Sequence, residues 1–302
     1  MPTHEQLRQR LIPFDSLRYS TDAFIDYRIP GCAPKKNYAL IGSGVSQSPN
    51  QPVSLREKHG FQVGGVSMPA GTTNPPHMHF TAEVFICTKG RWQMHWGFDP
   101  DPLTAEIGEG DIFTVPTWIY RGFQSLGPDA FMFTALGRDD TGGILWGPWT
   151  LDAAREQGVH LTEDYRIIDE QLGQKWSATD KRLQPMTPPE IDALRKWTPE
   201  QMARRAVRFA DLDWSTDALL DSSLPGCGGA IAPVIGLGMS QERNHLAPVH
   251  NAHGFSIEWL RLPAGGSMSR HTLADKQVLV VYRGQVGITI DGSDAPVTIE
   301  AS

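Results

Sequence analysis

Two segments of this 302-residue chain repeat each other at a fixed distance. Residues 60–71 begin with Gly-Phe and end with Pro-Ala-Gly, and residues 254–265 do the same 194 positions later. The run Ile41-Gly-Ser-Gly-Val-Ser-Gln47 recurs at the same distance as Ile235-Gly-Leu-Gly-Met-Ser-Gln241. An internal repeat on this scale predicts that the chain contains one domain twice.

The composition points to β-structure in each repeat. The chain has 30 Gly and 23 Pro, and turn residues divide it into short apolar runs, which is typical of strands. Many short strands predict an all-β sandwich or barrel. In the first repeat we expect strands near 38–45, 60–68, 76–87, 91–97, 111–116, 119–125 and 130–136.

A helical linker is expected between the repeats. Thr187-Pro-Pro-Glu190 and Thr198-Pro-Glu-Gln201 both place Thr three residues before Glu or Gln, with Pro between them. This pattern is a capping box with Pro at the first helical position. We therefore divide the chain into an N-terminal barrel with its arm at 1–150, a helical linker at 151–205 and a C-terminal repeat at 206–302.

Charge and composition argue against two kinds of partner. The net charge is −7, whereas nucleic-acid binding needs a basic surface. No stretch approaches 18 apolar residues, so we expect no membrane partner. The chain has three cysteines and no visible secretory signal, which favours a cytoplasmic location. We further expect a homo-oligomer that binds a small-molecule acidic substrate.

Three side chains that can bind a metal lie close together in the first repeat. His77, His79 and Glu83 occupy odd positions, and side chains of like parity share one face of a strand. Imidazole and carboxylate ligands suit Fe, Mn, Zn, Ni or Cu. On a straight strand Glu83 would lie about 13 Å from His79. One ion can bind both only if residues 80–82 turn the chain.

This stretch resembles the first signature of the cupin family. In that signature Gly is followed after five residues by His-x-His, then by Glu, and after six more residues by Gly. Gly71, His77, His79, Glu83 and Gly90 match it at every spacing. The resemblance implies tandem jelly-roll barrels, a bicupin layout, with the two histidines and the glutamate as metal ligands.

A second cupin signature follows in altered form. Gly110, Asp111 and Pro116 fit it, but Arg121 stands where the family has a histidine. The family normally takes its fourth metal ligand from that histidine. The resemblance therefore implies three of four ligands here, with a cation in the place of the fourth.

The C-terminal repeat lacks most of the ligand set. At the 194-residue offset His77 corresponds to His271, but His79 corresponds to Leu273 and Glu83 to Gln277. We expect one metal per chain, in the first repeat. The counterpart of the second signature would lie beyond residue 302. The second barrel is thus expected to be incomplete, either because the sequence is a fragment, which we favour, or because something else closes it.

Several roles stay open for the residues around the ligands. Glu83 either binds the metal directly or holds a ligand histidine by a hydrogen bond. Arg121 is a candidate catalytic residue that binds a substrate carboxylate through its bidentate guanidinium; the alternative is that it pairs with Glu83. Tyr120 is a candidate for hydrogen bonding to the substrate. His95 is a candidate substitute ligand.

Two histidines and one carboxylate form the facial triad of non-haem Fe(II) oxygenases. The leading hypothesis is an Fe(II) dioxygenase that acts on a small aromatic or enol-type carboxylate. One alternative keeps a divalent metal, with Mn(II), Zn(II) or Ni(II) possible, for isomerase, lyase or decarboxylase chemistry. The other is a metal-free bicupin that binds a small molecule.

Overall fold

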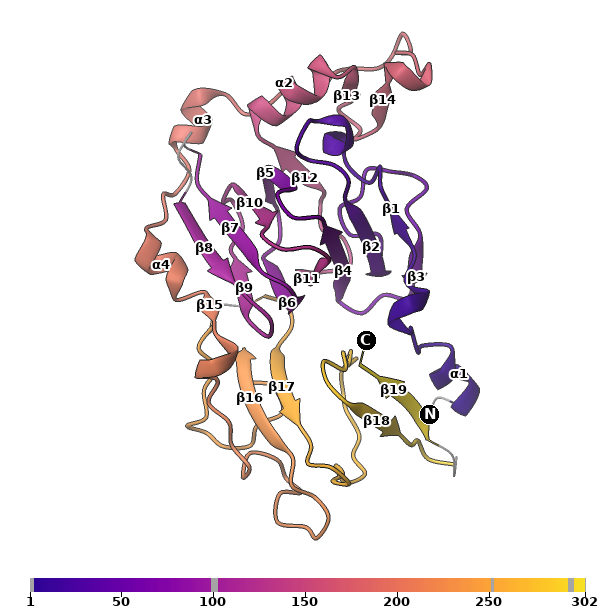
Figure 1. The fold of residues 1–302 in the computed structure, drawn as a ribbon, viewed down its shortest axis with the longest axis vertical. Helices are drawn as coiled ribbons and strands as arrows, with labels where there is room; N and C mark the ends of the chain where they lie inside the picture. Colours follow the sequence, from indigo (N-terminus) through magenta and orange to yellow (C-terminus); the bar gives the residue numbers. More distant parts are fainter. Residues whose placement is uncertain (1–2, 99–102, 251–252, 293–295, 302) are drawn as a thin grey trace.

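Two sheets of mainly antiparallel strands form a barrel, and most of their strands come from the first half of the chain (Figure 1). The computed structural model describes residues 3–98, 103–250, 253–292 and 296–301. The larger sheet has eight strands in the order β1-β2-β4-β11-β6-β9-β15, with β3 beside β2. Their bounds are β1 Tyr19–Ser20, β2 Lys36–Ile41, β3 Val53–Leu55, β4 Phe61–Met68, β6 Glu83–Lys89, β9 Ile112–Val115, β11 Ala130–Gly137 and β15 Ala206–Val207.

The smaller sheet has five strands in the order β12-β5-β10-β7-β8. Their bounds are β5 Thr73–His79, β7 Trp92–Trp96, β8 Leu103–Ile107, β10 Arg121–Ser125 and β12 Ile144–Trp146. The sheets face each other across a core to which both contribute, with Val66, Phe85 and Met132 from the larger sheet and Trp92 and Phe123 from the smaller. This is the all-β jelly roll that the sequence predicted.

The N-terminal arm and the segment after the barrel cover its outside. The arm contains α1 (His4–Arg8) and two 3-10 turns, η1 (Phe14–Ser16) and η2 (Ile25–Arg28). Helix α2 (Pro148–Glu156) packs beside η2 in the same apolar cluster, through Ala154 and Ile25. In the part of the chain that the structure describes, no helix has the length and apolar character needed to cross a bilayer.

The linker is less helical than predicted. The capping boxes do start helices, α3 (Pro188–Asp192) and α4 (Pro199–Ala203). Between α2 and α3, however, lie a hairpin of β13 (Val159–Leu161) and β14 (Ile167–Asp169) and the 3-10 turn η3 (Glu170–Leu172). β-Branched residues such as Val159 and Ile167 favour strands, and this pattern was missed.

The C-terminal repeat reproduces the first strand pair of the barrel. β16 (Ala230–Ile235) pairs with β17 (Ile257–Arg261) as β2 pairs with β4. Lys36 lies opposite Ser67, and Ala230 lies opposite Arg261, both 194 residues later. Both ladders even shift register at the same place, after Ala39 and after Pro233. The 3-10 turn η4 (Phe209–Asp211) precedes this pair.

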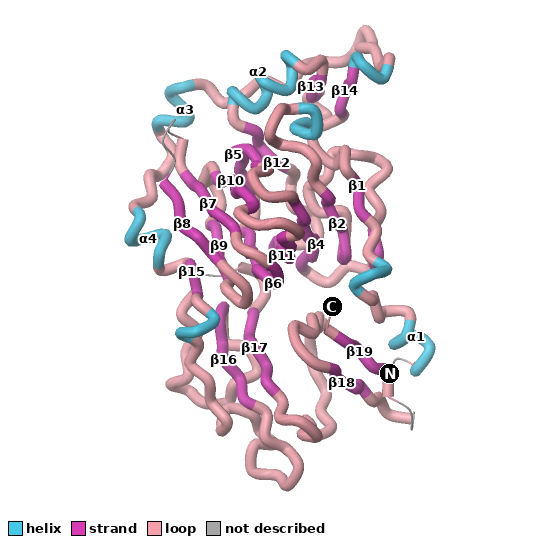
Figure 2. The backbone as a smooth tube through the Cα atoms, in the orientation of Figure 1, coloured by secondary structure: helices cyan, strands magenta, loops and turns pink. Residues whose placement is uncertain are grey.

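Beyond β17 the repeats differ. Figure 2 shows the segment between β17 and β18 as loop, where the first repeat has β5 and β6. The chain ends in a separate hairpin of β18 (Gln285–Ile288) and β19 (Val297–Glu300). In the first repeat β5 lies between β10 and β12, and β6 between β11 and β9. Adding the 194-residue offset to β9–β12 gives positions 306–340, outside the 302-residue sequence. The expected superposition of 60–90 on 254–284 therefore holds for the first strand pair and is wrong for the segment after β17.

Candidate metal centre

A bulge in β5 sets the orientation of its histidines. Arg121 of β10 lies opposite His77, but Phe123 lies opposite Asn74, so β5 advances three residues where β10 advances two. The extra residue falls at Pro75-Pro76, and proline has no N–H to donate to a ladder. Asn74 and His77 consequently both line the barrel cavity, although their positions differ in parity.

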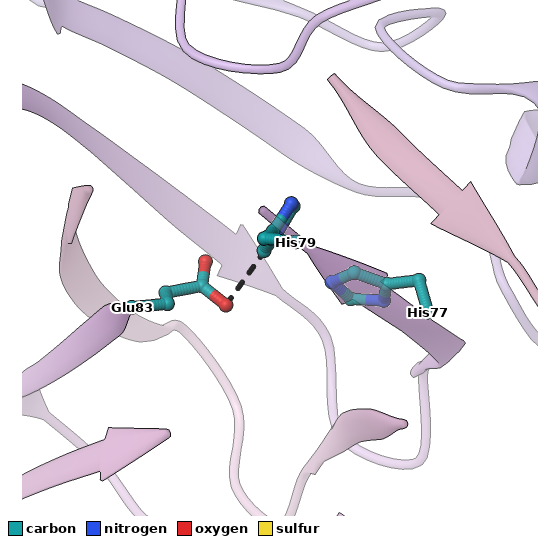
Figure 3. Close-up of side chains that lie close together, drawn as sticks. All are labelled: His77, His79 and Glu83. Atoms are coloured by element: carbon teal, nitrogen blue, oxygen red, sulfur yellow. Dashed lines mark ion pairs between the residues drawn. The ribbon is translucent and has the colours of Figure 1, made fainter. Parts of the chain in front are cut away.

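A short turn brings Glu83 back to the histidines. β5 ends at His79 in the smaller sheet, and β6 begins at Glu83 in the larger one. The chain therefore crosses between the sheets within three residues. Potential ligand atoms of His77, His79 and Glu83 all lie within 4.8 Å of one another, and all three residues are buried (Figure 3). The turn that one shared ion requires is thus present.

Backbone carbonyls hold both imidazole rings by their Nδ1 atoms. His77 Nδ1 lies 2.9 Å from the Pro75 carbonyl oxygen, and His79 Nδ1 lies 3.3 Å from that of Gly143. A carbonyl only accepts, so for His79 this contact favours a proton on Nδ1 and leaves Nε2 free to bind a metal. His77 Nδ1 faces both the Pro75 carbonyl and the amide nitrogen of Asn74, which can only donate. His79 Nε2 lies 3.5 Å from Glu83 Oε2. Two electron-rich atoms at this spacing can share one metal at bond lengths of about 2.1 Å.

Burial keeps both imidazoles neutral. It holds the pKa of His77 well below its usual range, and the charge of Arg121 lowers that pKa further. The pKa of His79 is lowered in the same way, first by burial and then by Arg121. Neutral imidazole is the form that binds a metal. The donor set therefore fits a divalent cation.

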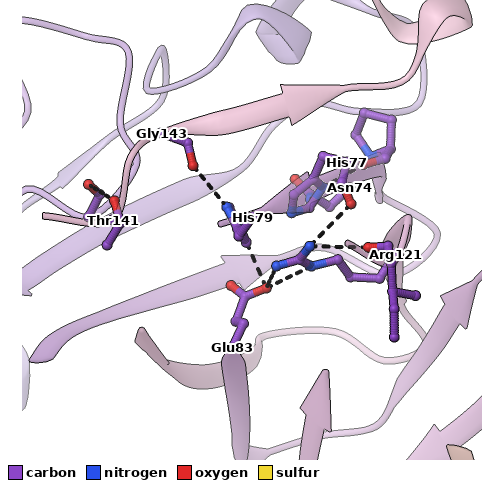
Figure 4. A network of polar contacts seen from close by, with 10 residues as sticks. Asn74, His77, His79, Glu83, Arg121, Thr141 and Gly143 are labelled. Carbon is purple, nitrogen blue, oxygen red and sulfur yellow. Dashed lines mark hydrogen bonds and ion pairs between the residues drawn. The ribbon is translucent and has the colours of Figure 1, made fainter. Parts of the chain in front are cut away.

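Arg121 lies inside the barrel, and its partner is Glu83 (Figure 4). Its Nε and Nη2 both donate to Glu83 Oε2 at 3.1 Å. Its Nη1 donates to the carbonyls of Ile119, at 3.2 Å, and His77, at 3.4 Å. Burial raises the pKa of Glu83, and the Arg121 guanidinium opposes that shift. Of the two partners considered for Arg121, the structure has the protein carboxylate.

Tyr120 and His95 are not brought to the ligands. Tyr120 packs against Met78 and Ile191, in an apolar cluster separate from the barrel core. Met78 follows His77 on the strand, and Tyr120 precedes Arg121, so both point away from the cavity. His95 lies opposite Gly122 of β10, and its neighbours Met94 and Trp96 belong to the barrel core. The His95 side chain therefore points to the outer face of the sheet. Neither Tyr120 nor His95 lines the cavity.

A buried polar network behind His77 was not predicted. Asn74 Nδ2 lies 3.2 Å from His77 Nδ1, and Lys35 Nζ donates to Asn74 Oδ1 at 2.7 Å. Lys35 also forms a buried ion pair with Asp26. Asn74 could have been suspected from its place before Pro75-Pro76. Lys35 and Asp26 lie too far away in the sequence to give such a signal.

The ligands open onto a cavity of about 80 Å³ between the sheets. Its polar lining includes Asn37, Gln62, Asn74 and Thr134, and its apolar lining includes Phe123 and Trp146. A second hollow of about 220 Å³ shares the 43–46 loop and Gln62 with it and adds Asp139 and Asp140. The two hollows are therefore neighbours that share one wall.

Comparison with known families now identifies the barrel. The sequence profile of the family described as Cupin matches residues 52–147, which include His77, His79, Glu83 and Arg121. Residues 52–147 therefore form a cupin domain. This cupin segment contains most of the strands of both sheets, from β3 to β12.

Solved structures similar to this cupin are only distant. An oxalate oxidase in complex with glycolate is 23% identical, with 30% of this chain and 48% of that chain covered and a TM-score of 0.28. The chain thus spans about half the length of that protein. Oxalate decarboxylase from Bacillus subtilis is 12% identical, with 66% and 48% covered and a TM-score of 0.37. KdgF from Halomonas sp. is 14% identical, with 33% and 76% covered and a TM-score of 0.26. No curated protein sequence matches significantly.

Proposed function

We propose that the chain is a metal-dependent cupin enzyme that acts on a small carboxylic acid. The observation that carries this proposal is the convergence of His77, His79 and Glu83, whose ligand atoms lie within 4.8 Å. All three are buried and border a cavity, so a bound ion would contact a small molecule held there. A divalent cation held by these residues would supply Lewis-acid activation of the substrate or, if it is Fe(II), redox chemistry.

Charge in the site supports an acidic substrate. The two imidazoles are neutral, and the single charges of Glu83 and Arg121 offset each other. A divalent ion therefore leaves the site with a net positive charge in a buried setting, where electrostatic attraction is strong. Asn37 and Gln62 add hydrogen-bonding groups at the cavity wall. Together these groups bind and orient an anion of few atoms.

The size of the cavity limits the range of substrates further. A cavity of about 150 Å³ binds benzene, and the cavity beside the ligands measures about 80 Å³. This space favours a short-chain acid over the aromatic acid considered from the sequence. It also favours a second candidate reaction, non-redox decarboxylase or lyase chemistry, because a dioxygenase must hold O₂ beside its substrate.

The test combines metal analysis with two product assays. We expect freshly purified protein to contain one divalent metal per chain. Protein reconstituted with Fe(II) or Mn(II) is incubated with short-chain hydroxy, keto and dicarboxylic acids while O₂ uptake and CO₂ release are recorded. O₂ uptake supports the dioxygenase, and CO₂ release without O₂ uptake supports the decarboxylase. Protein that neither contains nor takes up a metal would refute both and favour the metal-free binding protein.

A further inference from the structure

The guanidinium of Arg121 is anchored from two sides. Glu83 Oε2 accepts from Nε and Nη2, and the carbonyls of Ile119 and His77 accept from Nη1. The side chain is completely buried, and that of Glu83 is 7% exposed. With these contacts in place, Arg121 is a fixed element of the site, which makes it a poor group for capturing a substrate.

The Arg121 guanidinium lies beside the same carboxylate oxygen, Glu83 Oε2, that would bind a metal. A metal bound by Glu83 would lie about 2 Å from a carboxylate oxygen. The guanidinium nitrogens already lie 3.1 Å from Oε2. Two cations that share one buried carboxylate repel each other strongly, because screening is weak in the interior.

The same cation has the opposite effect on the metal-free protein. An isolated charge buried without a partner is costly, and Glu83 would be such a charge if no cation were near. Arg121 neutralises it. The barrel can therefore keep its ligand carboxylate ionised and in place before a metal arrives.

We propose that Arg121 is an internal cation that stands in for the metal at Glu83. It keeps the metal-free barrel stable, and in exchange it weakens metal binding, so that the metal can be taken up and released by the folded protein. The assignment rests on the proposed metal site and adds how that site is regulated. Arg121 is in these terms a positioning residue, since it acts on the metal through Glu83.

The experiment measures Mn(II) binding and urea unfolding for wild-type protein, Arg121→Met and Arg121→His. Arg121→Met removes the competing cation, so we expect Mn(II) to bind at least about tenfold more tightly, while the metal-free protein unfolds at lower urea. Adding saturating Mn(II) should restore the lost stability. Arg121→His also adds an imidazole at the same position and should bind Mn(II) more tightly still.

Two further variants serve as controls. Arg28→Met removes a basic residue of the N-terminal arm that pairs with the buried Asp169 of β14, outside the barrel. It should lower stability without tightening Mn(II) binding. Glu83→Gln/Arg121→Met removes both charges and should recover metal-free stability while losing Mn(II) binding, which keeps the test open if Arg121→Met alone fails to fold.

The outcomes separate this proposal from the proposed function. If wild-type protein binds no Mn(II) but Arg121→Met or Arg121→His does, Arg121 is the blocking cation and the wild-type chain is not a metal enzyme. If wild-type protein binds Mn(II) and Arg121→Met binds it equally or more weakly, the internal-cation assignment is wrong and the metal site stands. Failure of both Arg121→Met and the double variant to fold would show that Arg121 serves only the fold, and would overturn the proposal.

Discussion

The two repeats share one strand pair and differ in the segment that follows it. β2 and β4 pair in the same register as β16 and β17, with the same irregularity in each ladder. The next segment forms β5 and β6 in the first repeat and a loop in the second. A pair of neighbouring strands can satisfy its hydrogen bonds locally, whereas β5 and β6 pair with β9–β12.

The ligand positions show the same division. His271 keeps a local contact of His77, since its Nδ1 lies 2.8 Å from the carbonyl of Ser269, two residues earlier, as His77 Nδ1 lies 2.9 Å from that of Pro75. His271 is exposed, however, whereas His77 is buried. A histidine alone in an open loop is a poor metal ligand. The barrel, and not the histidine motif by itself, makes the site.

The largest expected effect tests this contrast directly. His77→Ala should leave the protein largely metal-free, with an affinity loss beyond the roughly 10–100-fold that outer-shell changes cost. His271→Ala should leave metal content unchanged. Elemental analysis of both variants against wild-type protein is the measurement. Two metals per chain, or loss of metal in His271→Ala, would show that the second repeat also binds.

The next effect concerns stability. Glu83→Gln gives the first repeat the residue that the second has at Gln277, and it leaves Arg121 buried without a counter-charge. Removing one partner of a buried ion pair costs about 3–5 kcal/mol. Urea unfolding of metal-free protein at neutral pH measures the loss. A change below about 1 kcal/mol would mean that Arg121 finds other partners, and that the pair shown in Figure 4 is not essential.

The convergence of the three candidate ligands could be predicted because their spacing is a local property. His77, His79 and Glu83 lie within seven residues, and the turn between His79 and Glu83 brings them together. The inward position of Arg121 also followed from the motif. Its pairing with Glu83 was one of two open alternatives, and only three-dimensional contacts decide between them.

Other features of the site depend on irregularities that a pattern does not reveal. Asn74 reaches the cavity because the bulge at Pro75-Pro76 shifts the alternation by one residue. The contact of Lys35 with Asn74 joins residues 39 positions apart. The prediction placed both Tyr120 and Arg121 in the site. Neighbours on a strand point to opposite faces, so only one of them could face the cavity.

A smaller effect is expected where the first repeat has Gly64 and the second has Glu258. A Cβ at Gly64 would lie 2.9 Å from the Tyr38 carbonyl oxygen and 3.0 Å from Thr134 Oγ1. Gly64→Ala should cost about 1–3 kcal/mol, as overpacking does. Gly127→Ala is the matched control, because nothing lies within 4 Å of a Cβ there. Equal stability of the two variants in urea would show that the strands simply move apart.

The smallest effect concerns Glu258 itself, which stands in β17 at the position of Gly64. Its Oε2 accepts from the Met239 N–H at 2.7 Å, and burial raises its pKa above the ordinary value of 4.5. A folded-state pKa above the unfolded one means that the folded protein holds the proton longer. The contribution of the protonated Glu258 carboxyl to stability is therefore fully present below pH 4.5, and it is lost as the pH rises through the folded-state pKa.

Glu258→Gln removes this pH dependence while keeping an oxygen that can accept from Met239. The variant should be more stable than wild-type protein at pH 7 by less than about 1 kcal/mol, because the carboxyl is partly exposed to solvent. Near pH 4 the difference should disappear, since the wild-type carboxyl is then protonated. Urea unfolding at the two pH values measures it, with Glu156→Gln as the same charge change at an exposed position. If Glu258→Gln were destabilising at pH 7, the bond from the Met239 N–H would outweigh the cost of burying the charge, and the glutamate would be a stabilising feature of the second repeat.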